Sequence, residues 1–216
     1  MFFLDLLFPP RLDEALLREV RLVDFLEKLS PQLVPATRPP AVALLPYSDP
    51  LVRAAIHEAK YHGSEHAFSL LAATLADFLP DYLADHRAFS NVGHPMSYIS
   101  IVPVPLGAAR WRERGYNQVE EVAKRTLKLL DMPGIRLDTS LLLRTRETTT
   151  QVSLPRLARE ENMRGAFLAT RAADPAYLYI VLDDVLTTGA TLQAALDALV
   201  AAGIHRDQII PLALAH

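Results

Sequence analysis

Two adjacent carboxylates and a loop rich in hydroxyl groups stand together near the C-terminal end of the sequence. Asp183 and Asp184 directly follow four large apolar residues, 179–182. Those apolar residues are typical of a strand that is buried on both faces. Two residues after the acids, the small residues Thr-Thr-Gly-Ala-Thr occupy positions 187–191. The order of strand, acids and small-residue loop indicates a binding site at the end of a strand.

A loop of small residues between a strand and a helix is suited to bind phosphate. Its backbone N–H groups turn toward one point, and the positive end of the helix dipole points to the same place. A helical pattern over residues 192–202, ended by Gly203, completes the unit. The hydroxyls of Thr187, Thr188 and Thr191 add hydrogen bonds to phosphate oxygens. Because carboxylates repel phosphate, we expect the acids to accept hydrogen bonds from sugar hydroxyls beside it.

Other proteins also carry paired acids at the end of a strand. Walker-B strands do so, but they require a Gly-x-x-x-x-Gly-Lys-Ser/Thr loop, and the sequence has none. Phospho-acceptor domains and a purely structural loop are the remaining alternatives. The residues favour a site for a phosphorylated sugar, with the phosphate in the loop and the ribose diol on the acids.

A second strand leads into a turn that we expect at the same edge of the sheet. Residues 98–102 predict a buried strand, and prolines make the turn at 103–107 rigid. Because ligands bind at the carboxyl ends of parallel strands, this turn should lie beside Asp183. The candidate donors to a second anion are the N–H groups of Val104, Leu106 and Gly107 and the side chains of Arg110, Arg112 and Arg114. The alternative for the arginines is a basic helix start that Trp111 anchors by packing.

Lysine and histidine side chains on either side of a predicted turn at Gly63 are further candidates. Lys60 is either a cation that reaches a phosphate or an ordinary surface lysine. His57, His62 and His66 invite a metal site. We expect none there, because Gly63 interrupts the helix between the last two and no acid offers a convincing third ligand.

The predicted elements alternate between strands and helices after residue 40. Before it, a helix over 13–29 is capped by Asp13, and the proline-rich residues 30–40 indicate a linker. The apolar stripe of that helix, expected to pack on the main domain or on a partner chain, is Leu12, Leu16, Val20, Val23, Leu26 and Leu29. Further elements are strands at 41–47, 135–143, 166–169 and 208–215, helices at 49–63, 66–84 and 118–130, a polar loop at 86–97 and a polar segment at 144–154 that is typical of a lid.

Composition narrows the class of protein. The chain has 216 residues, half of them hydrophobic, and no cysteine, so it has neither a disulfide nor a thiolate metal site. No apolar run is long enough for a membrane span, and Asp5 makes residues 1–8 a poor signal peptide, so we expect the cytosol. The net charge is −3, but residues 106–165 carry +4 and the remainder −7. A basic middle in an acidic chain favours a polyanionic ligand, with a solvated basic helix face as the alternative.

Residues 179–191 resemble the phosphoribosyl-diphosphate (PRPP) motif of type I phosphoribosyltransferases. Over residues 44–216 the chain is similar to one branch, the ComF-like, competence-associated phosphoribosyltransferases. The matching stretches are Lys60-Tyr-His-Gly63, Pro103-Val-Pro105, Arg112-x-Arg114-Gly-Tyr-Asn-Gln118, Arg144-x-x-x-Thr148-x-x-Gln151-x-x-Leu154, Arg159-x-x-Asn162, Ala166-Phe167 and the loop at 183–191. The number and order of these matches make the resemblance specific.

The resemblance implies a type I phosphoribosyltransferase fold, with a mainly parallel twisted sheet flanked by helices. Its parts would be an N-terminal helix and linker at 1–40, a hood and first helices at 41–97, and the core at 98–216. It implies that PRPP binds with Mg²⁺ and that phosphoribosyl passes to an acceptor we do not identify. The alternative is a module that binds PRPP, a nucleotide or single-stranded DNA in DNA uptake without any transfer.

The resemblance also assigns roles to residues. Asp183 and Asp184 would hold the ribose, directly or through Mg²⁺. The 5′-phosphate would lie on Thr187, Thr188, Gly189, Ala190 and Thr191. The pyrophosphate would lie on Val104, Pro105, Leu106, Gly107, Arg110, Arg112 and Arg114. Lid or accessory roles would fall to Lys60, Asn117, Gln118, Arg144, Thr148, Gln151, Arg159 and Asn162.

One departure from the family's pattern limits what can be carried over. Many members have an N-terminal four-cysteine zinc module, whereas a helix and a proline-rich segment occupy residues 11–40 here. We therefore expect Mg²⁺ but no zinc. Beyond PRPP or a nucleotide, the candidate partners are single-stranded DNA, the competence machinery and a second copy of the chain that uses the 13–29 helix.

Overall fold

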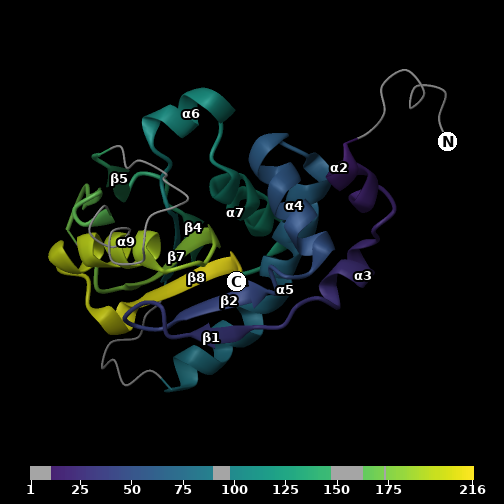
Figure 1. Cartoon of the computed structure of the whole chain (residues 1–216). Coiled ribbons are helices and arrows are strands. Elements are labelled where there is room, and N and C mark those ends of the chain that lie inside the picture. Colours follow the sequence, from purple (N-terminus) through teal and green to yellow (C-terminus); the bar gives the residue numbers. More distant parts are fainter. Residues whose placement is uncertain (1–10, 90–97, 147–162, 173) are drawn as a thin grey trace.

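The fold is a six-stranded sheet with helices on both faces (Figure 1). The computed structural model describes residues 11–89, 98–146, 163–172 and 174–216. The strand order is β1-β2-β8-β7-β3-β4, and every neighbouring pair is parallel except β1 with β2. The strands are β1 (Gln32–Val34), β2 (Ala41–Leu45), β3 (Tyr98–Pro103), β4 (Ile135–Leu137), β7 (Tyr177–Val185) and β8 (Ile209–Ala215). The predicted α/β class, with a mostly parallel sheet flanked by helices, is confirmed.

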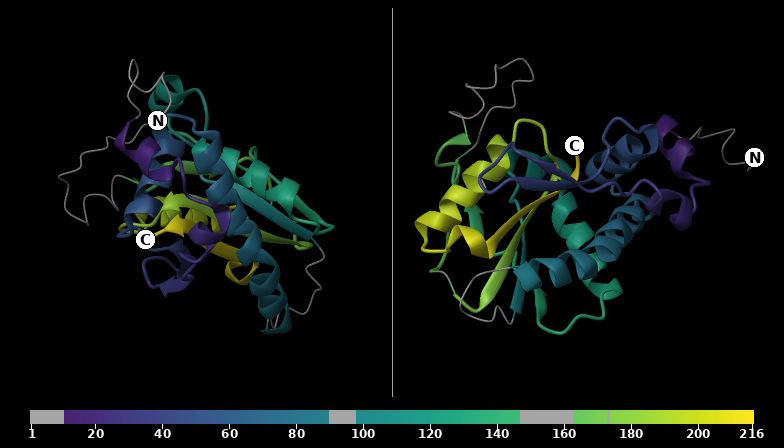
Figure 2. Two further views of the ribbon diagram at one scale, coloured as in Figure 1. Left: turned by 90° about the vertical axis from the view of Figure 1, so that its right-hand side faces the viewer. Right: turned by 90° about the horizontal axis from the view of Figure 1, so that it is seen from below.

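The central strand β7 is buried on both faces, as its apolar run predicts. Leu178, Ile180 and Leu182 face one core, while Tyr179 and Val181 face the other. The first core lies under α4 (Pro50–Tyr61), α5 (Glu65–Phe89) and α7 (Gln118–Leu129), and the second lies under α9 (Ala190–Ala201). Figure 2 shows the sheet between these two layers. Successive side chains of a strand point to opposite faces, so a strand covered on both sides must be apolar throughout.

The starts of α4 and α7 follow the predicted signals. Asp49 caps α4 by accepting a hydrogen bond from the Leu51 N–H at 2.8 Å, and Pro50 occupies the first turn. Asn117 caps α7 in the same way through the Val119 N–H at 3.1 Å. The helix predicted to begin near residue 66 starts at Glu65 and continues to Phe89, so the polar loop expected from residue 86 begins later than predicted.

Among the described residues, one helical stretch, Glu65–Asp85 of α5, is apolar and long enough to cross a membrane by length and composition alone. In the fold, 56% of that stretch is buried against the rest of the chain. Its apolar face is therefore accounted for by the core between α5 and the sheet.

The single helix predicted over 13–29 is wrong. The segment forms two short helices, α2 (Leu12–Leu17) and α3 (Leu22–Leu26), and Asp13 does not cap either of them. The predicted stripe is also wrong, because Leu12 is 78% exposed while Leu17 and Phe25 are buried. The physical reason is tertiary: α2 packs on α4 and α3 packs on α5 (Figure 1), so the chain turns between two different helices.

The proline-rich segment predicted as a linker contains part of the sheet. Strand β1 lies within it and pairs antiparallel with β2. The turn between these strands reaches α9, where the Arg38 N–H donates to Oε1 of Gln193 at 2.8 Å. Arg206 in turn donates to the Arg38 carbonyl at 2.7 Å. The segment is thus fixed beside the first turn of α9.

The strand predicted over 135–143 divides into two strands in different sheets. Residues after β4 turn away at Asp138, whose Oδ1 accepts hydrogen bonds from the N–H and the hydroxyl of Ser140. This local side-chain bond makes the bend. Beyond it, β5 (Leu142–Arg144) pairs antiparallel with β6 (Phe167–Ala169), and this small sheet covers one side of α9.

Candidate functional site

The two loops singled out by the sequence lie at the same edge of the sheet. Strands β3 and β7 are parallel neighbours, with Pro103 opposite Leu182. The turn that follows β3 and the loop that follows β7 therefore leave the sheet side by side. Helix α9 starts at Ala190, two residues earlier than predicted, and Gly189 precedes it with φ of 78°.

The loop after β7 forms a small open cavity, which we call the β7 cup. Its lining is Asp183, Val185, Leu186, Thr187, Thr188, Gly189, Ala190, Thr191 and Leu192. Across the described chain, the N–H groups of Thr187, Thr188 and Gly189 meet no protein acceptor. The first turn of α9 adds the Thr191 N–H, which has no intrahelical acceptor. Unpaired N–H groups at a helix start attract an anion.

Gly189 is required at its position in the β7 cup. Its positive φ favours glycine, and a Cβ there would lie 2.5 Å from the carbonyl oxygen of Ala36. Ala36 belongs to the turn between β1 and β2, so the segment predicted as a linker packs against the loop that forms the cup. The sequence carries no sign of this contact, because 153 residues separate the two positions.

Asp184 is fully engaged inside the protein. It is 8% exposed, and its Oδ2 contacts Nζ of Lys60 at 2.9 Å and Nε2 of Gln118 at 2.6 Å. Its Oδ1 accepts from the Val185 N–H at 2.7 Å. Burial raises the pKa of Asp184, but Lys60 and Gln118 outweigh it and hold that pKa below the ordinary value. The carboxylate is therefore ionised and satisfied.

Asp183, unlike Asp184, has an oxygen without a protein partner in the described residues and a raised pKa. Its Oδ1 accepts from the Asp184 N–H at 2.9 Å, and its other oxygen has no partner in the described residues. Burial and the negative charge of Asp184 raise the pKa of Asp183 to about 7, against the opposing charges of Lys60 and Arg110. Near neutral pH this carboxyl therefore exchanges its proton readily and has an oxygen free for a ligand.

Five side chains are linked by contacts through Asp184, and we call them the Asp184 clamp: Lys60, Tyr61, Arg114, Gln118 and Asp184. Nη1 of Arg114 donates to Oε1 of Gln118 at 3.1 Å, and its guanidinium lies 4.8 Å from the centre of the Tyr61 ring. Tyr61 and Lys60, at the two ends of this series of contacts, are consecutive residues of α4.

Neighbouring residues hold the clamp in place. The Tyr116 hydroxyl donates to the Ala59 carbonyl at 3.0 Å, and Nδ2 of Asn117 donates to the Val104 carbonyl at 3.0 Å. These bonds join the start of α7 to α4 and to the turn after β3. The Lys60-Tyr-His-Gly and Arg-Gly-Tyr-Asn-Gln stretches thus meet each other through Asp184. Lys60 is not an ordinary surface lysine, since it pairs with Asp184, and its reach to a phosphate stays a prediction.

The turn after β3 offers fewer donors than predicted. The Val104 N–H donates to the Leu182 carbonyl at 2.9 Å and is therefore unavailable to an anion. The N–H groups of Leu106 and Gly107 have no acceptor in the described part of the chain. This bond extends the hydrogen-bonding between β3 and β7 beyond Pro103, so the Val104 N–H is used within the sheet.

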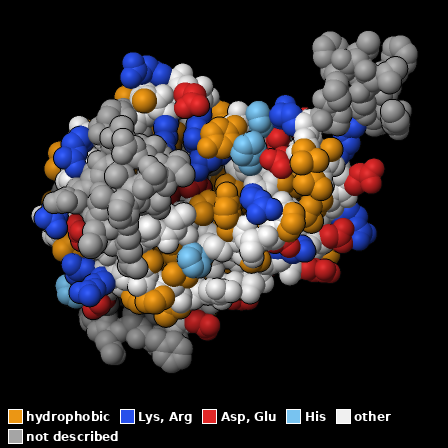
Figure 3. All heavy atoms as spheres, viewed as in Figure 1, with side chains coloured by type: hydrophobic (Ala, Val, Ile, Leu, Met, Phe, Trp, Pro, Cys, Tyr) orange, Lys and Arg blue, Asp and Glu red, His pale blue; other side chains and the backbone are white. Residues whose placement is uncertain are grey.

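The arginines after this turn lie on a short helix, α6 (Ala108–Arg114). Arg110 is close enough to Asp183 to lower that carboxyl's pKa, and Arg112 is exposed, with Nε donating to the Ala108 carbonyl at 3.3 Å. Arg114 belongs to the clamp. Trp111 is 49% exposed, so it does not act as the buried anchor of a basic helix. Figure 3 shows histidine, basic and hydrophobic side chains gathered over α4 and α6.

The predicted lid is described only at its edges. Arg144 ends β5, with its guanidinium 5.5 Å from the centre of the Phe167 ring. The other residues assigned to the lid, Thr148, Gln151, Arg159 and Asn162, lie outside the described residues.

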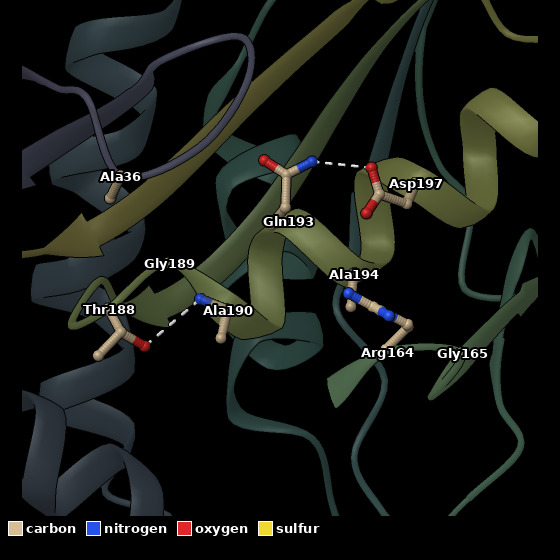
Figure 4. Close-up of a pocket in the computed structure, with 9 residues that line it drawn as sticks. All are labelled: Ala36, Arg164, Gly165, Thr188, Gly189, Ala190, Gln193, Ala194 and Asp197. Atoms are coloured by element: carbon tan, nitrogen blue, oxygen red, sulfur yellow. Dashed lines mark hydrogen bonds between the residues drawn. The ribbon is translucent and has the colours of Figure 1, made fainter. Parts of the chain in front are cut away.

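A second cavity of about 270 Å³ lies beside the β7 cup and has no counterpart among the sequence predictions (Figure 4). Its lining is Ala36, Arg164, Gly165, Thr188, Gly189, Ala190, Gln193, Ala194 and Asp197. Nε2 of Gln193 donates to Oδ1 of Asp197 at 2.8 Å along one face of α9. Thr188, Gly189 and Ala190 belong to the predicted phosphate loop, but the cavity itself is not predictable from it, because Ala36 and Arg164 come from segments that are remote in sequence.

No family model matches the chain. Two curated proteins do. Competence protein F of Haemophilus influenzae is 35% identical over 118 residues, which cover 54% of this chain and 50% of that protein. DNA utilization protein YhgH of Escherichia coli is 35% identical over 92 residues, covering 43% of this chain and 39% of that protein. The chain spans half or less of the length of each relative. Over the matched residues, these similarities support the resemblance to a ComF-like family.

Proposed function

We propose that this protein binds PRPP with Mg²⁺ and transfers its phosphoribosyl group to an acceptor. The observation that carries the proposal is the β7 cup, which is lined by Asp183 and by loop residues whose N–H groups meet no acceptor in the described chain. A phosphate in the cup would leave the attached ribose over the half-buried Asp183. The names of the two relatives place those proteins in competence and in DNA utilization, so we propose that the chain acts in DNA uptake or processing.

In this proposal, the two anionic ends of PRPP have separate sites. The 5′-phosphate accepts hydrogen bonds from the N–H groups and hydroxyls of Thr187, Thr188 and Thr191. The pyrophosphate lies over the N–H groups of Leu106 and Gly107, with Arg110 and Arg112 as charged donors. Arg114 keeps its place in the Asp184 clamp. The two acids have different roles. Asp183 binds the ribose hydroxyls, and Asp184 holds Lys60 and Gln118 in position.

The residues at the site fit Mg²⁺ through one carboxylate. Asp183 has an unpartnered oxygen, which is the hard donor that Mg²⁺ prefers. Asp184 has no free position while Lys60 and Gln118 occupy its Oδ2. Mg²⁺ commonly binds through one or two carboxylates together with substrate phosphates. When bound, it neutralises charge on the diphosphate and so favours departure of pyrophosphate.

Catalysis would rest on placing charge around the breaking bond at C1′. As pyrophosphate leaves, positive charge develops at C1′ and negative charge on the departing oxygens. Preorganised donors at the pyrophosphate site stabilise that separation, with a typical contribution of about 3 kcal/mol for each well-placed donor. An ionised Asp183 beneath the ribose also stabilises the positive charge. The Asp184 clamp contributes by holding the C-terminal ends of β7 and α6 in place beside the proposed ribose site.

Calorimetric titration of PRPP with Mg²⁺ into the full chain tests this proposal. We expect saturable binding that Asp183→Asn weakens at least tenfold, while Asp207→Asn, an exposed acid at the other end of the sheet, leaves binding unchanged. A screen of nucleobases and amines for PRPP-dependent pyrophosphate release then identifies the acceptor. Absence of PRPP binding by the wild-type chain would refute the proposal, and binding without release would leave a PRPP-binding module.

Single-stranded DNA binding is the second candidate function, and the exposed Trp111 favours it. This ring lies on α6 together with Arg110 and Arg112, and these residues offer a stacking surface and cations. We expect affinity for an oligonucleotide that falls steeply with salt, because phosphate contacts release counterions. Trp111→Ala should weaken binding, whereas Tyr98→Ala, an equally exposed aromatic at the opposite end of β3, should not. Salt-independent binding, or equal effects of both variants, would remove this candidate.

A further inference from the structure

Three potential metal ligands meet at the end of α4, away from the PRPP site. His57, Glu58 and His62 each bring a ligand atom, and these atoms lie within 4.8 Å of one another. From the sequence no acid is a convincing third ligand, but Glu58 lies between these two histidines in the fold. His66 is not part of the group, since its Nε2 lies 3.0 Å from the Leu17 carbonyl.

Glu58 is a buried and ionised carboxylate. It is 1% exposed, and Arg11 contacts both of its oxygens, at 3.0 Å from Nε and 2.7 Å from Nη2. The hydrogen bond from Arg11, together with the positive potential of Arg11, His62 and His57, lowers the pKa of Glu58 despite its burial. Each carboxylate oxygen has two lone pairs, so Oε1 can accept from Arg11 and still coordinate an ion. This oxygen lies 3.9 Å from Nε2 of His62.

The two histidines are suited to complete the site. Nδ1 of His57 lies 2.9 Å from Oδ2 of Asp13, a contact that places the ring proton on Nδ1 and leaves Nε2 free to coordinate. A carboxylate behind a histidine is the usual support of a metal-binding imidazole. The side chains of His57 and His62 are 46% and 31% exposed, so both rings can turn.

We propose that His57, Glu58 and His62 bind one divalent ion of the Zn²⁺ class, with Asp13 orienting His57. Two imidazole nitrogens and one carboxylate oxygen are a donor set that Zn²⁺ accepts, with a fourth position left for water. Bonds of about 2.0–2.2 Å require the ligand atoms to approach by roughly 1 Å from their present separation. Nitrogen donors favour Zn²⁺ over Mg²⁺. The proposal departs from the sequence-based expectation of no zinc, which rested on the absence of cysteine and of a convincing acidic ligand beside the histidines.

The proposed ion would join α2 to the end of α4. Asp13 comes from α2, and His62 lies two residues after Lys60 of the Asp184 clamp. Binding would therefore fix the turn that carries Lys60. The site does not depend on PRPP, because none of its ligands contacts Asp183 or the β7 cup.

Titration of the EDTA-treated full chain with Co²⁺, followed by visible absorption and by competition with Zn²⁺, tests the proposal. We expect one ion per chain, loss of binding in His57→Gln and in His62→Gln, and a weakening of about 10–100-fold in Asp13→Asn. His66→Gln is the matched control and should bind as the wild type does. Failure of the wild type to bind Zn²⁺ or Co²⁺ would overturn the proposal, as would unchanged binding in His62→Gln.

Thermal unfolding gives a second readout that needs no spectroscopic ion. Zn²⁺ should raise the melting temperature of the wild type and of His66→Gln, because an ion that binds only the folded chain stabilises it. It should leave the melting temperature of His62→Gln unchanged. Arg11→Met should bind Zn²⁺ more tightly, since the substitution removes a positive charge that repels the ion. Equal shifts in all variants would mean non-specific binding and would refute the site.

Discussion

The β7 cup and the Asp184 clamp lie next to each other at one edge of the sheet, yet they use their polar groups in opposite ways. In the cup, backbone donors at Thr187, Thr188 and Gly189 have no protein partner among the described residues. In the clamp, both oxygens of Asp184 are occupied by protein donors. The boundary falls between two consecutive residues, because Asp183 keeps an open oxygen and Asp184 does not.

This contrast separates groups that are open to a ligand from groups that stabilise the fold. A buried polar group that is already satisfied gains nothing from a ligand unless it first gives up a partner, whereas an unsatisfied donor gains a full hydrogen bond. Groups of the cup should therefore affect ligand affinity more than folding. Groups of the clamp should affect folding more than direct contact with the ligand.

The largest effect on stability is expected at Asp184. Asp184→Ala leaves the Lys60 ammonium without its partner in a mostly buried place, and loss of one member of such a pair costs about 3 kcal/mol or more. The measurement is the free energy of unfolding in urea. Asp183→Ala is the matched comparison, and it should cost far less because only one local hydrogen bond is lost. Equal costs for the two variants would contradict the division between cup and clamp.

A smaller loss is expected at Gly189. Gly189→Ala introduces a Cβ at positive φ and against the Ala36 carbonyl, so we expect a loss of roughly 2–3 kcal/mol together with loss of PRPP binding. Gly203→Ala is the control, because its φ is also positive but no atom lies within 4 Å of its added Cβ. That control should cost about 1 kcal/mol and leave binding intact. Identical losses would mean that the contact with Ala36 does not matter.

The pH dependence of stability should differ between the two acids. A pKa near 7 for folded Asp183, against about 3.9 in the unfolded chain, means that the folded state binds more protons between those values. The contribution of Asp183 therefore favours folding at low pH and is lost as the pH rises from about 4 to 7. For Asp184 the lowered pKa has the opposite sign, and its contribution is lost on acidification.

Asp183→Asn should accordingly flatten the decline in stability between about pH 4 and pH 7 and make the chain more stable than the wild type above pH 7. Urea unfolding midpoints of both proteins, measured at intervals across this range, check the slope. A variant whose midpoints run parallel to those of the wild type would show that Asp183 titrates normally.

The smallest effect on stability is expected at Arg112. Its side chain is exposed and makes one bond to the first turn of its own helix, so Arg112→Ala should change the unfolding free energy by less than about 0.5 kcal/mol. The same variant should weaken pyrophosphate binding, measured by calorimetry. Arg114→Ala provides the contrast, because it removes a clamp member and should lower stability. Arg112→Ala with unchanged pyrophosphate affinity would remove this residue from the proposed site.

Much of the core of the fold was predictable because its signals are local. The apolar run of β7 and the capping residue Asp49 each act within a few neighbours, and the structure agrees with both. Predictions failed where distant segments compete. The helix expected at 13–29 breaks because Leu17 and Phe25 bury against different helices, and the expected linker is a strand because β2 offers it an open edge.

The sequence by itself determined the small-residue loop, its placement between a buried strand and a helix, and the neighbouring acids, because backbone conformation and helix starts depend on adjacent residues. Only the tertiary structure decided which donors stay open. The Val104 N–H donates to the Leu182 carbonyl, and Lys60 of α4 pairs with Asp184. Glu58 lies beside two histidines, and its contact with Arg11 keeps it ionised. Each of these outcomes depends on which remote group arrives within hydrogen-bonding distance, and spacing along the chain does not record that.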